Sequence, residues 1–236
     1  MDQLRQSLDD EEIKYVVWKN THEIKEALRG NEDLDILVNR CQFNDFVKIL
    51  NLHGFRQGVP VLSNFQNIFH FYGHDSQLEK ILHLHVYTRL VTGESHLKNY
   101  HLPLERMLLE GYSRSKDGLR VASAETQRVL FIIRHYIKSS CMPGLLLLTM
   151  HKSIHVGEHE LLFAGVSKIF TETEKNLITK LNVPEHLFLR MIEAYPESCL
   201  FKIILGVRLR WALRSQRRGT AIANLILRYW QILIRI

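Results

Sequence analysis

Cysteine is scarce in this sequence of 236 residues, which contains only Cys41, Cys141 and Cys199. The three lie far apart and include no CxxC pair, which argues against a disulfide framework and against a thiolate zinc site. The sequence also lacks a run of about 18 apolar residues, and its first segment, MDQLRQSLDDEEIK, is polar and acidic where a signal peptide is basic and then apolar. We therefore expect a cytoplasmic protein without a membrane span.

Three short motifs of well-known catalytic sites are missing as well. The sequence has no GxxxxGK(S/T) loop and no GxGxxG turn, so it shows neither a P-loop nor a dinucleotide-binding site. It also has no GxSxG sequence, which would place a nucleophilic serine on a sharp strand-to-helix turn. Any chemistry of this chain must therefore come from other groups of residues.

Acidic residues are absent from the last part of the chain. From Ser198 onward there is no Asp or Glu, and the basic residues there are Lys202, Arg208, Arg210, Arg214, Arg217, Arg218, Arg228 and Arg235. These eight positive charges exceed the formal net charge of +6 of the whole chain, so the first 197 residues carry a formal charge of −2. A basic tail therefore follows a nearly neutral body.

Residues 206–236 are predicted to form a basic amphipathic helix or linker, because apolar residues recur there at helical spacing. These residues are Ile222, Leu225, Ile226, Tyr229, Leu233 and Ile236. Such a helix could cover the chain's own core, lie on an anionic membrane surface or bind nucleic acid, and we expect nucleic acid least of the three. Because the apolar stripe is still running at the last residue, we also expect a continuation beyond it.

The first 120 residues contain short strand and helix signals in close succession. The predicted strands are 13–18, 33–38, 67–72 and 80–87, and the predicted helices are 21–29 and 43–53. Asn20 and Glu23 have the spacing of a capping box at the start of the first helix, and Gly30 is predicted to end it as a left-handed cap. Residues 73–76 are predicted as the turn between the last two strands.

Beyond about residue 120 the sequence changes to long helical segments. The first has a serine cap at Ser123, and the following ones are separated by Pro143, Gly157, Pro184 and Pro196. The sequence therefore predicts an α+β fold with a small mixed-sheet domain at 1–120, a helical bundle at 121–205 and the basic segment at 206–236.

Two aspartates stand at an unusual place, beside and inside an apolar run. In the sequence Asp33-Leu-Asp35-Ile-Leu-Val38 alternate side chains of a strand share a face, so both carboxylates point to one side while Leu34 and Ile36 point to the other. Two carboxylates about 7 Å apart along a strand can converge on Mg²⁺, which prefers oxygen ligands. The alternative is a pair of solvated acids at the start of an edge strand.

Two segments of the sequence resemble a known superfold. YVVWKNTHEIKEALRGNEDLDILV, residues 15–38, resembles the opening of the nucleotidyltransferase superfold, in which a strand with two aspartates follows a short helix and binds the catalytic metals. LHLHVYTRLVTGESHLKNYHLPLE, residues 82–105, is similar to a second block of a family of this superfold found in bacterial gene clusters for surface polysaccharides. Because that family is often fused to a kinase-like domain related to thymidylate kinase, the resemblance implies such a domain or partner beyond the C-terminus.

The resemblance also implies site residues, with two departures from the usual pattern. The loop that usually has a Gly-Ser pair for the nucleotide phosphates reads WKNT here, so Lys19 and Asn20 are the candidate phosphate contacts, with Lys98 as a further one. The third carboxylate usual on a later strand is replaced by His83 and His85. Imidazole suits Mn²⁺ or Zn²⁺ better than Mg²⁺, so either the metal preference is altered or the site no longer performs transfer.

Two functions follow from this pattern. In the first, Mg²⁺ or Mn²⁺ is bound by Asp33, Asp35, His83 and His85, a nucleoside triphosphate is the substrate, and Asp35 or His83 takes the proton of a small hydroxyl acceptor. The product then belongs to surface polysaccharide synthesis. In the second, the domain is a non-catalytic module that binds nucleotide or a partner and serves an attached kinase-like domain.

Overall fold

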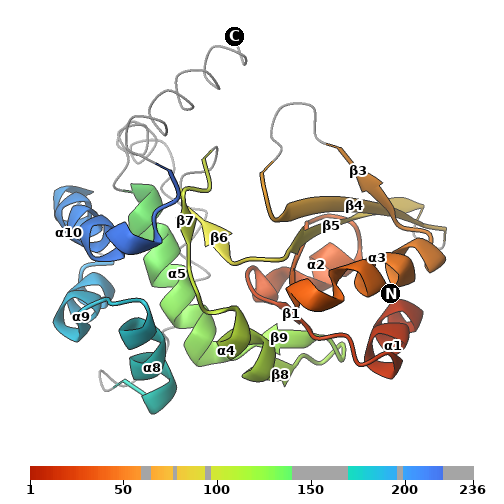
Figure 1. Cartoon of the computed structure of the whole chain (residues 1–236), viewed down its shortest axis with the longest axis horizontal. Coiled ribbons are helices and arrows are strands. Elements are labelled where there is room, and N and C mark those ends of the chain that lie inside the picture. Colours follow the sequence, from red (N-terminus) through yellow and green to blue (C-terminus); the bar gives the residue numbers. More distant parts are fainter. Residues whose placement is uncertain (60–64, 77–78, 94–96, 140–169, 196–198, 220–236) are drawn as a thin grey trace, which may run out of the picture. The chain divides into compact units, whose positions relative to one another are not determined.

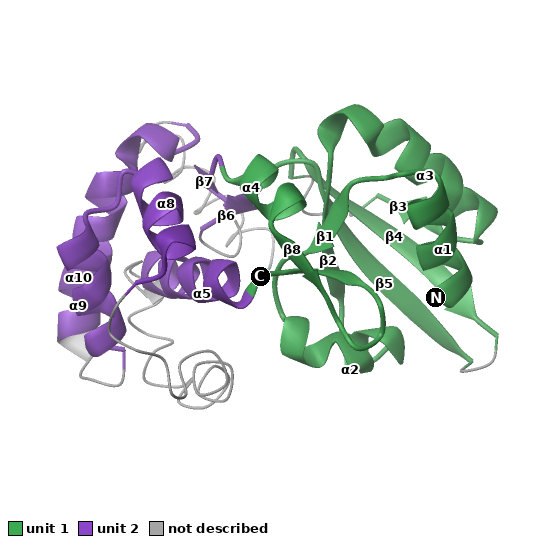
Figure 2. Ribbon diagram, turned by 90° about the horizontal axis from the view of Figure 1, so that it is seen from below, with its two compact units in different colours: residues 1–90, 104–123 green, residues 91–103, 124–236 purple. Residues whose placement is uncertain are grey.

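The computed structural model describes residues 1–59, 65–76, 79–93, 97–139, 170–195 and 199–219. The chain divides into two compact units (Figure 2). Unit 1 comprises residues 1–90 and 104–123, and unit 2 comprises residues 91–103 and 124–236. The predicted boundary at residue 120 lies close to the end of unit 1, whereas residues 91–103 group with unit 2. Among the helices of the described ranges, none is both long and apolar enough to cross a membrane.

Unit 1 is built around a seven-stranded sheet with the order β3-β4-β5-β2-β1-β9-β8 (Figure 1). Its strands are β1 Tyr15–Val17, β2 Leu34–Val38, β3 Arg56–Gly58, β4 Ile68–Asp75, β5 Lys80–Tyr87, β8 Tyr112–Arg114 and β9 Arg120–Ala122. Strand β2 pairs parallel to β5 and antiparallel to β1, while β4 and β5 form an antiparallel hairpin. These pairings confirm the predicted mixed sheet and the α+β class.

One face of this sheet packs in a buried apolar cluster with helices. The helices of unit 1 are α1 Asp2–Asp10, η1 Thr21–Glu23, α2 Ile24–Leu28, η2 Arg40–Gln42, α3 Phe43–Leu52 and α4 Glu105–Glu110. Leu34, Ile36 and Val38 of β2 belong to one cluster with buried residues of α1, α2 and α3, as their alternation in the sequence predicts. Burial of each such side chain contributes about 1.5–3 kcal/mol, so this face anchors the register of β2.

The other face of the sheet holds a group of polar side chains beside the buried Leu37 and Tyr87. Asp35 on β2 pairs with His85 on β5, and His85 in turn pairs with His70 on β4. Residues paired across neighbouring strands lie on the same face, so one aspartate and two histidines from three strands come together. The register that buries Leu34 and Ile36 therefore also gathers the polar groups on the opposite face.

Two local predictions in unit 1 are wrong. Strand β4 continues to Asp75, so Gly73 and His74 lie in the strand and the predicted turn at 73–76 falls too early. Asn20 has a left-handed backbone (φ 53°) and makes no side-chain cap, because a 3₁₀ turn rather than an α-helix follows it. The prediction for Gly30 is confirmed: its φ is 72°, and a Cβ there would lie 3.0 Å from the carbonyl oxygen of Ile81.

Asp9 connects α1 to the hairpin of β8 and β9. Its carboxylate accepts hydrogen bonds from Arg114 Nη1 at 3.0 Å and from Arg120 Nη2 at 2.7 Å. Partial burial raises the pKa of Asp9, but the hydrogen bonds and charges of the two arginines more than offset this and lower the pKa below its usual value. Asp9 is therefore an anion held in place by two strands.

We expect Asp9→Asn to lower the free energy of unfolding by about 1–2 kcal/mol at pH 7, because charge-assisted hydrogen bonds are lost. Since the pKa is lower in the folded state, this contribution is complete above the unfolded pKa of Asp and is lost as the pH falls through the folded pKa. Urea unfolding at pH 7 and pH 3 measures both effects. Asp45→Asn, which breaks an exposed pair with Lys48, should cost under about 0.5 kcal/mol, and an equal loss in both variants would refute the role of Asp9.

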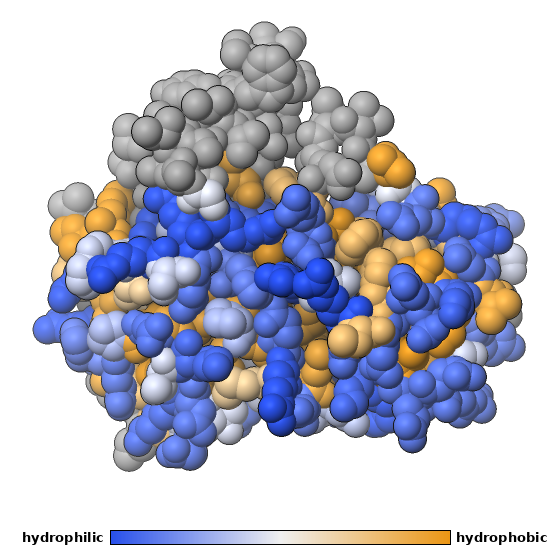
Figure 3. All heavy atoms as spheres, in the orientation of Figure 1, coloured by the Kyte–Doolittle hydropathy of each residue, from blue (hydrophilic) through white to orange (hydrophobic). Residues whose placement is uncertain are grey.

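Unit 2 is mainly helical, as predicted. Its elements within the described ranges are β6 Val91–Thr92, β7 Tyr100–His101, α5 Ala124–Ser139, α8 Glu172–Lys180, α9 Glu185–Glu193, α10 Cys199–Ala212 and η3 Leu213–Gln216. The helix predicted to start at Ser123 is present as α5. The helix predicted after Pro143 and the whole apolar stripe predicted from Ile222 to Ile236 lie outside the described residues. On the face shown in Figure 3, polar and apolar residues are interspersed over both units.

Candidate metal and phosphate site

The site begins with a buried ion pair between Lys19 and Asp35. The backbone N–H of Trp18, just after β1, donates to the carbonyl oxygen of Asp35 at 3.2 Å, which places Lys19 beside β2. Lys19 Nζ lies 2.7 Å from Asp35 Oδ1 and donates to Tyr87 Oη at 3.1 Å. The ammonium also lies over the rings of Trp18 and Tyr87, 5.4 and 5.3 Å from their centroids.

Asp35 remains an anion although it is only 2% exposed. Burial alone would raise its pKa, but the Lys19 ammonium and the contact with His85 more than offset burial and hold the pKa well below its usual range. A buried carboxylate of this kind requires its cation, since an unpaired buried charge is strongly unfavourable. Lys19 and Asp35 therefore act as one structural unit.

Asp33 and Asp35 are joined through histidine side chains. As an anion, Asp33 accepts a hydrogen bond from His83 Nδ1 at 2.6 Å. This bond lowers the pKa of Asp33 by more than partial burial raises it, so the pKa lies below its usual value. Around His85, Nε2 lies 3.6 Å from Asp33 Oδ2 and Nδ1 lies 3.4 Å from Asp35 Oδ1. The two carboxylates share one face, as the alternation predicts, with the His85 ring in contact with both.

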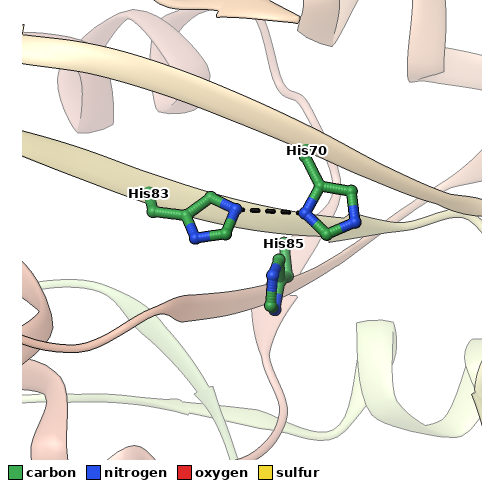
Figure 4. Close-up of side chains that lie close together, drawn as sticks. All are labelled: His70, His83 and His85. Atoms are coloured by element: carbon green, nitrogen blue, oxygen red, sulfur yellow. Dashed lines mark hydrogen bonds between the residues drawn. The ribbon is translucent and has the colours of Figure 1, made fainter. Parts of the chain in front are cut away.

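His70 is a member of this cluster that the sequence reasoning missed. Its Nδ1 lies 3.1 Å from His83 Nε2, and one ring nitrogen from each of His70, His83 and His85 can be chosen so that all three lie within 4.8 Å of one another (Figure 4). Burial, and then the two neighbouring imidazoles, lowers the pKa of His70 to about 4. His70 is therefore neutral at pH 7, and one of its ring nitrogens has a lone pair that can bind a metal ion.

The signal that could have identified His70 is the register of the hairpin. Once the turn is placed after Asp75, Tyr72 falls opposite His83 and His70 falls opposite His85. With the turn predicted at residues 73–76 the pairing is shifted, so the sequence does not place His70 opposite His85. Tyr72 stacks on His83 with the ring centroids 4.3 Å apart, so the same register also covers one side of the His83 ring.

The remaining predicted residues lie outside this group. Asn20 directly follows Lys19 with a left-handed backbone conformation. Lys98 lies between β6 and β7 and belongs to unit 2, with a φ of 44°. Phosphate contacts by Asn20 and Lys98 therefore stay predictions.

The donor set indicates which kind of ion the cluster suits. Three imidazoles face one another, and Asp35 is already paired with Lys19, which leaves Asp33 as the more accessible carboxylate with a side chain 47% exposed. Mg²⁺ requires oxygen ligands in near-octahedral geometry, whereas imidazole suits transition ions. The residues therefore fit a divalent transition ion, Mn²⁺ included, better than they fit Mg²⁺.

Comparison with known proteins identifies no family. No family model matches the sequence, and no curated protein matches it. Among solved structures the chain is similar to the crystal structure of JHP933 from Helicobacter pylori, with 14% sequence identity over 92% of this chain and 91% of that chain and a TM-score of 0.34. A likeness at that level supports no inference about fold or function.

Proposed function

We propose that unit 1 is a metal-dependent transferase domain that moves a nucleotidyl or phosphoryl group from a nucleoside triphosphate to a small hydroxyl acceptor. The observation that supports the proposal best is the contact of both Asp33 and Asp35 with His85 on one face of the sheet. The cluster is partly exposed on that face, since the side chains of His83 and His85 are 21% and 20% exposed. This exposure supports access of a triphosphate from solvent in the proposed function.

The chemistry needs positioning and charge neutralisation more than a strong nucleophile. In nucleotidyl transfer the acceptor oxygen bonds to the α-phosphorus, the bond to the bridging oxygen of the β-phosphate breaks, and pyrophosphate leaves. In phosphoryl transfer the same oxygen bonds to the γ-phosphorus, and a nucleoside diphosphate leaves. A bound divalent ion would neutralise phosphate charge and lower the pKa of the acceptor hydroxyl, whose proton leaves to solvent.

His83 is better placed as a ligand than as a proton acceptor. Its Nδ1 is bonded to Asp33, and its Nε2 already lies 3.1 Å from His70 Nδ1. A substrate hydroxyl would have to displace His70 to reach that nitrogen, whereas an ion between the two rings would use both. We therefore assign His83 the ligand role and Asp33 the role of orienting its ring.

The second candidate is a non-catalytic module of the same fold. The ion pair between Lys19 and Asp35 favours this module, because a carboxylate already neutralised by lysine is a weaker metal ligand. By the resemblance, such a module would serve a kinase-like domain in surface polysaccharide synthesis, and residues 206–236 would contact that partner or a membrane surface. For either candidate we propose a cytoplasmic location, which agrees with the free, exposed thiol of Cys41.

We expect nucleoside triphosphate to bind only with a divalent ion, and Asp33→Asn to weaken that binding at least roughly 10-fold, the usual cost of losing a carboxylate that orients a ligand. Calorimetry with ATP, CTP and GTP in Mg²⁺ and in Mn²⁺ measures it. Glu32→Gln removes the neighbouring exposed carboxylate and serves as the matched control, with no expected change. Pyrophosphate or nucleoside diphosphate release in the presence of polyols and sugars then separates the enzyme from the module.

Three outcomes decide between the candidates. Metal-dependent binding with turnover supports the transferase. Metal-dependent binding without turnover for any acceptor supports the nucleotide-binding module. Absence of nucleotide binding with both ions, in a chain whose unfolding transition is intact, refutes the transferase.

A further inference from the structure

We propose that His70, His83 and His85 form a three-nitrogen site for one divalent transition ion of the zinc class, which binds in the absence of nucleotide. This inference deepens the proposed function, because it names the cation and adds His70 as a ligand. It rests on that function only for the use of the ion, since the binding itself requires no nucleotide.

The three rings already have nearly the separation that a shared ion requires. Two nitrogen ligands of a tetrahedral zinc lie about 3.3 Å apart, given Zn–N distances of about 2.0–2.1 Å. His70 Nδ1 and His83 Nε2 are 3.1 Å apart, and one ring nitrogen from each of the three histidines can be chosen so that all three lie within 4.8 Å of one another. The proposal requires the His85 side chain to rotate so that one of its nitrogens closes the remaining gap.

Carboxylates behind two of the histidines give the arrangement typical of metal ligands. A ligating histidine usually donates its second ring N–H to a carboxylate, which fixes the tautomer and orients the ring. Asp33 accepts such a bond from His83 Nδ1 at 2.6 Å, leaving Nε2 toward His70. Asp35 lies 3.4 Å from His85 Nδ1 and is itself held by Lys19 at 2.7 Å, so the support of His85 is anchored in the buried part of unit 1.

The site would keep one coordination position for substrate. Three protein ligands and an open fourth position are characteristic of catalytic zinc, while structural zinc is held by four protein ligands. Cys41 is a free thiol, but it lies in η2, outside the cluster. The fourth position would therefore be taken by water or, in the proposed function, by a phosphate oxygen.

The test is titration of the chelator-treated full chain with Co²⁺, followed by its visible absorption, and with Zn²⁺ in competition with a chromophoric chelator. We expect one ion per chain. His70→Ala should weaken binding by more than roughly 100-fold, since loss of a ligand exceeds the 10–100-fold effect of losing an orienting partner, and Asp33→Asn should fall within that smaller range. His74→Ala is the matched control, because His74 is exposed on the same face of β4, and it should change affinity less than twofold.

Zn²⁺ should also raise the thermal unfolding midpoint of wild type and of His74→Ala, and leave that of His70→Ala unchanged, which separates lost binding from a misfolded variant. Equal Zn²⁺ affinity in His70→Ala and His74→Ala, or no binding to wild type, overturns the inference. If nucleotide binds with Mg²⁺ while Zn²⁺ does not bind, the inference fails and the proposed function stands. If Zn²⁺ binds as described and nucleotide does not, the metal site stands without the transferase.

Discussion

Lys19→Met is expected to lower the free energy of unfolding by about 3–5 kcal/mol, because it leaves the carboxylate of Asp35 buried without its cation. Asp35 is 2% exposed, and Lys19 Nζ is 2.7 Å from it. Methionine retains most of the apolar stem that packs beside Trp18 and Tyr87. The measured loss of stability therefore reports the missing charge rather than missing packing. Chemical unfolding monitored by tryptophan fluorescence measures the effect.

A double-mutant cycle separates the ion pair from simple packing. Lys19→Met together with Asp35→Leu replaces both charges by apolar groups, and such replacement of a buried pair is often neutral. We expect the double variant to recover most of the stability lost in Lys19→Met. Lys48→Met removes the exposed partner of Asp45 and should cost under about 1 kcal/mol. Additive losses in the double variant would show that Lys19 and Asp35 do not act as a pair.

Glu174→Ala is expected to cost about 3–5 kcal/mol in unit 2, since it leaves Arg128 buried without a partner. Arg128 Nε on α5 donates to Glu174 Oε1 at 2.8 Å. The other oxygen, Oε2, accepts from the backbone N–H of Thr171 at 2.9 Å and completes the capping box of α8. The Glu174 side chain therefore connects α5 to α8 and also caps the N-terminus of α8. Its removal loses both the ion pair and the cap.

Two substitutions distinguish these roles in thermal or urea unfolding. Glu174→Gln keeps an oxygen for the cap but removes the charge, and we expect an intermediate loss of stability. Glu172→Ala removes an exposed carboxylate from the same first turn of α8 and should cost under about 1 kcal/mol. Similar losses for Glu172→Ala and Glu174→Ala would contradict the assigned role of the buried pair.

Periodicity in the sequence predicted the four central strands of the sheet and two helices of unit 1, but not α1, α4 or the short strands β3, β8 and β9. Strand β5 has the predicted bounds, and the period of two in β2 correctly separated Leu34 and Ile36 from Asp33 and Asp35. Alternation succeeds there because one face is apolar enough that a slip by one residue would expose it. His83 and His85 were proposed beside the aspartates from the resemblance, and the structure brings both into contact with Asp33.

Contacts that depend on long-range register could not be read from the sequence. Lys19 is 16 positions from Asp35, and the histidine pair His70 and His83 is separated by 13 positions. Nothing in the local sequence marks Lys19 as buried, and the misplaced turn at 73–76 disguised His70. The capping box of Thr171 and Glu174 was present in the sequence as T-E-T-E, but Arg128, which makes Glu174 a buried partner, belongs to a different helix.

Anomalous diffraction from crystals of the full chain grown with Co²⁺ tests most directly the claim that unit 1 holds a divalent transition ion on its polar sheet face. The account predicts one strong anomalous peak per chain, with ring nitrogens of His70, His83 and His85 at about 2.0–2.2 Å from it. A chain with no peak at these histidines, or with the ion bound elsewhere while His70 and His83 remain hydrogen-bonded to each other, would contradict it.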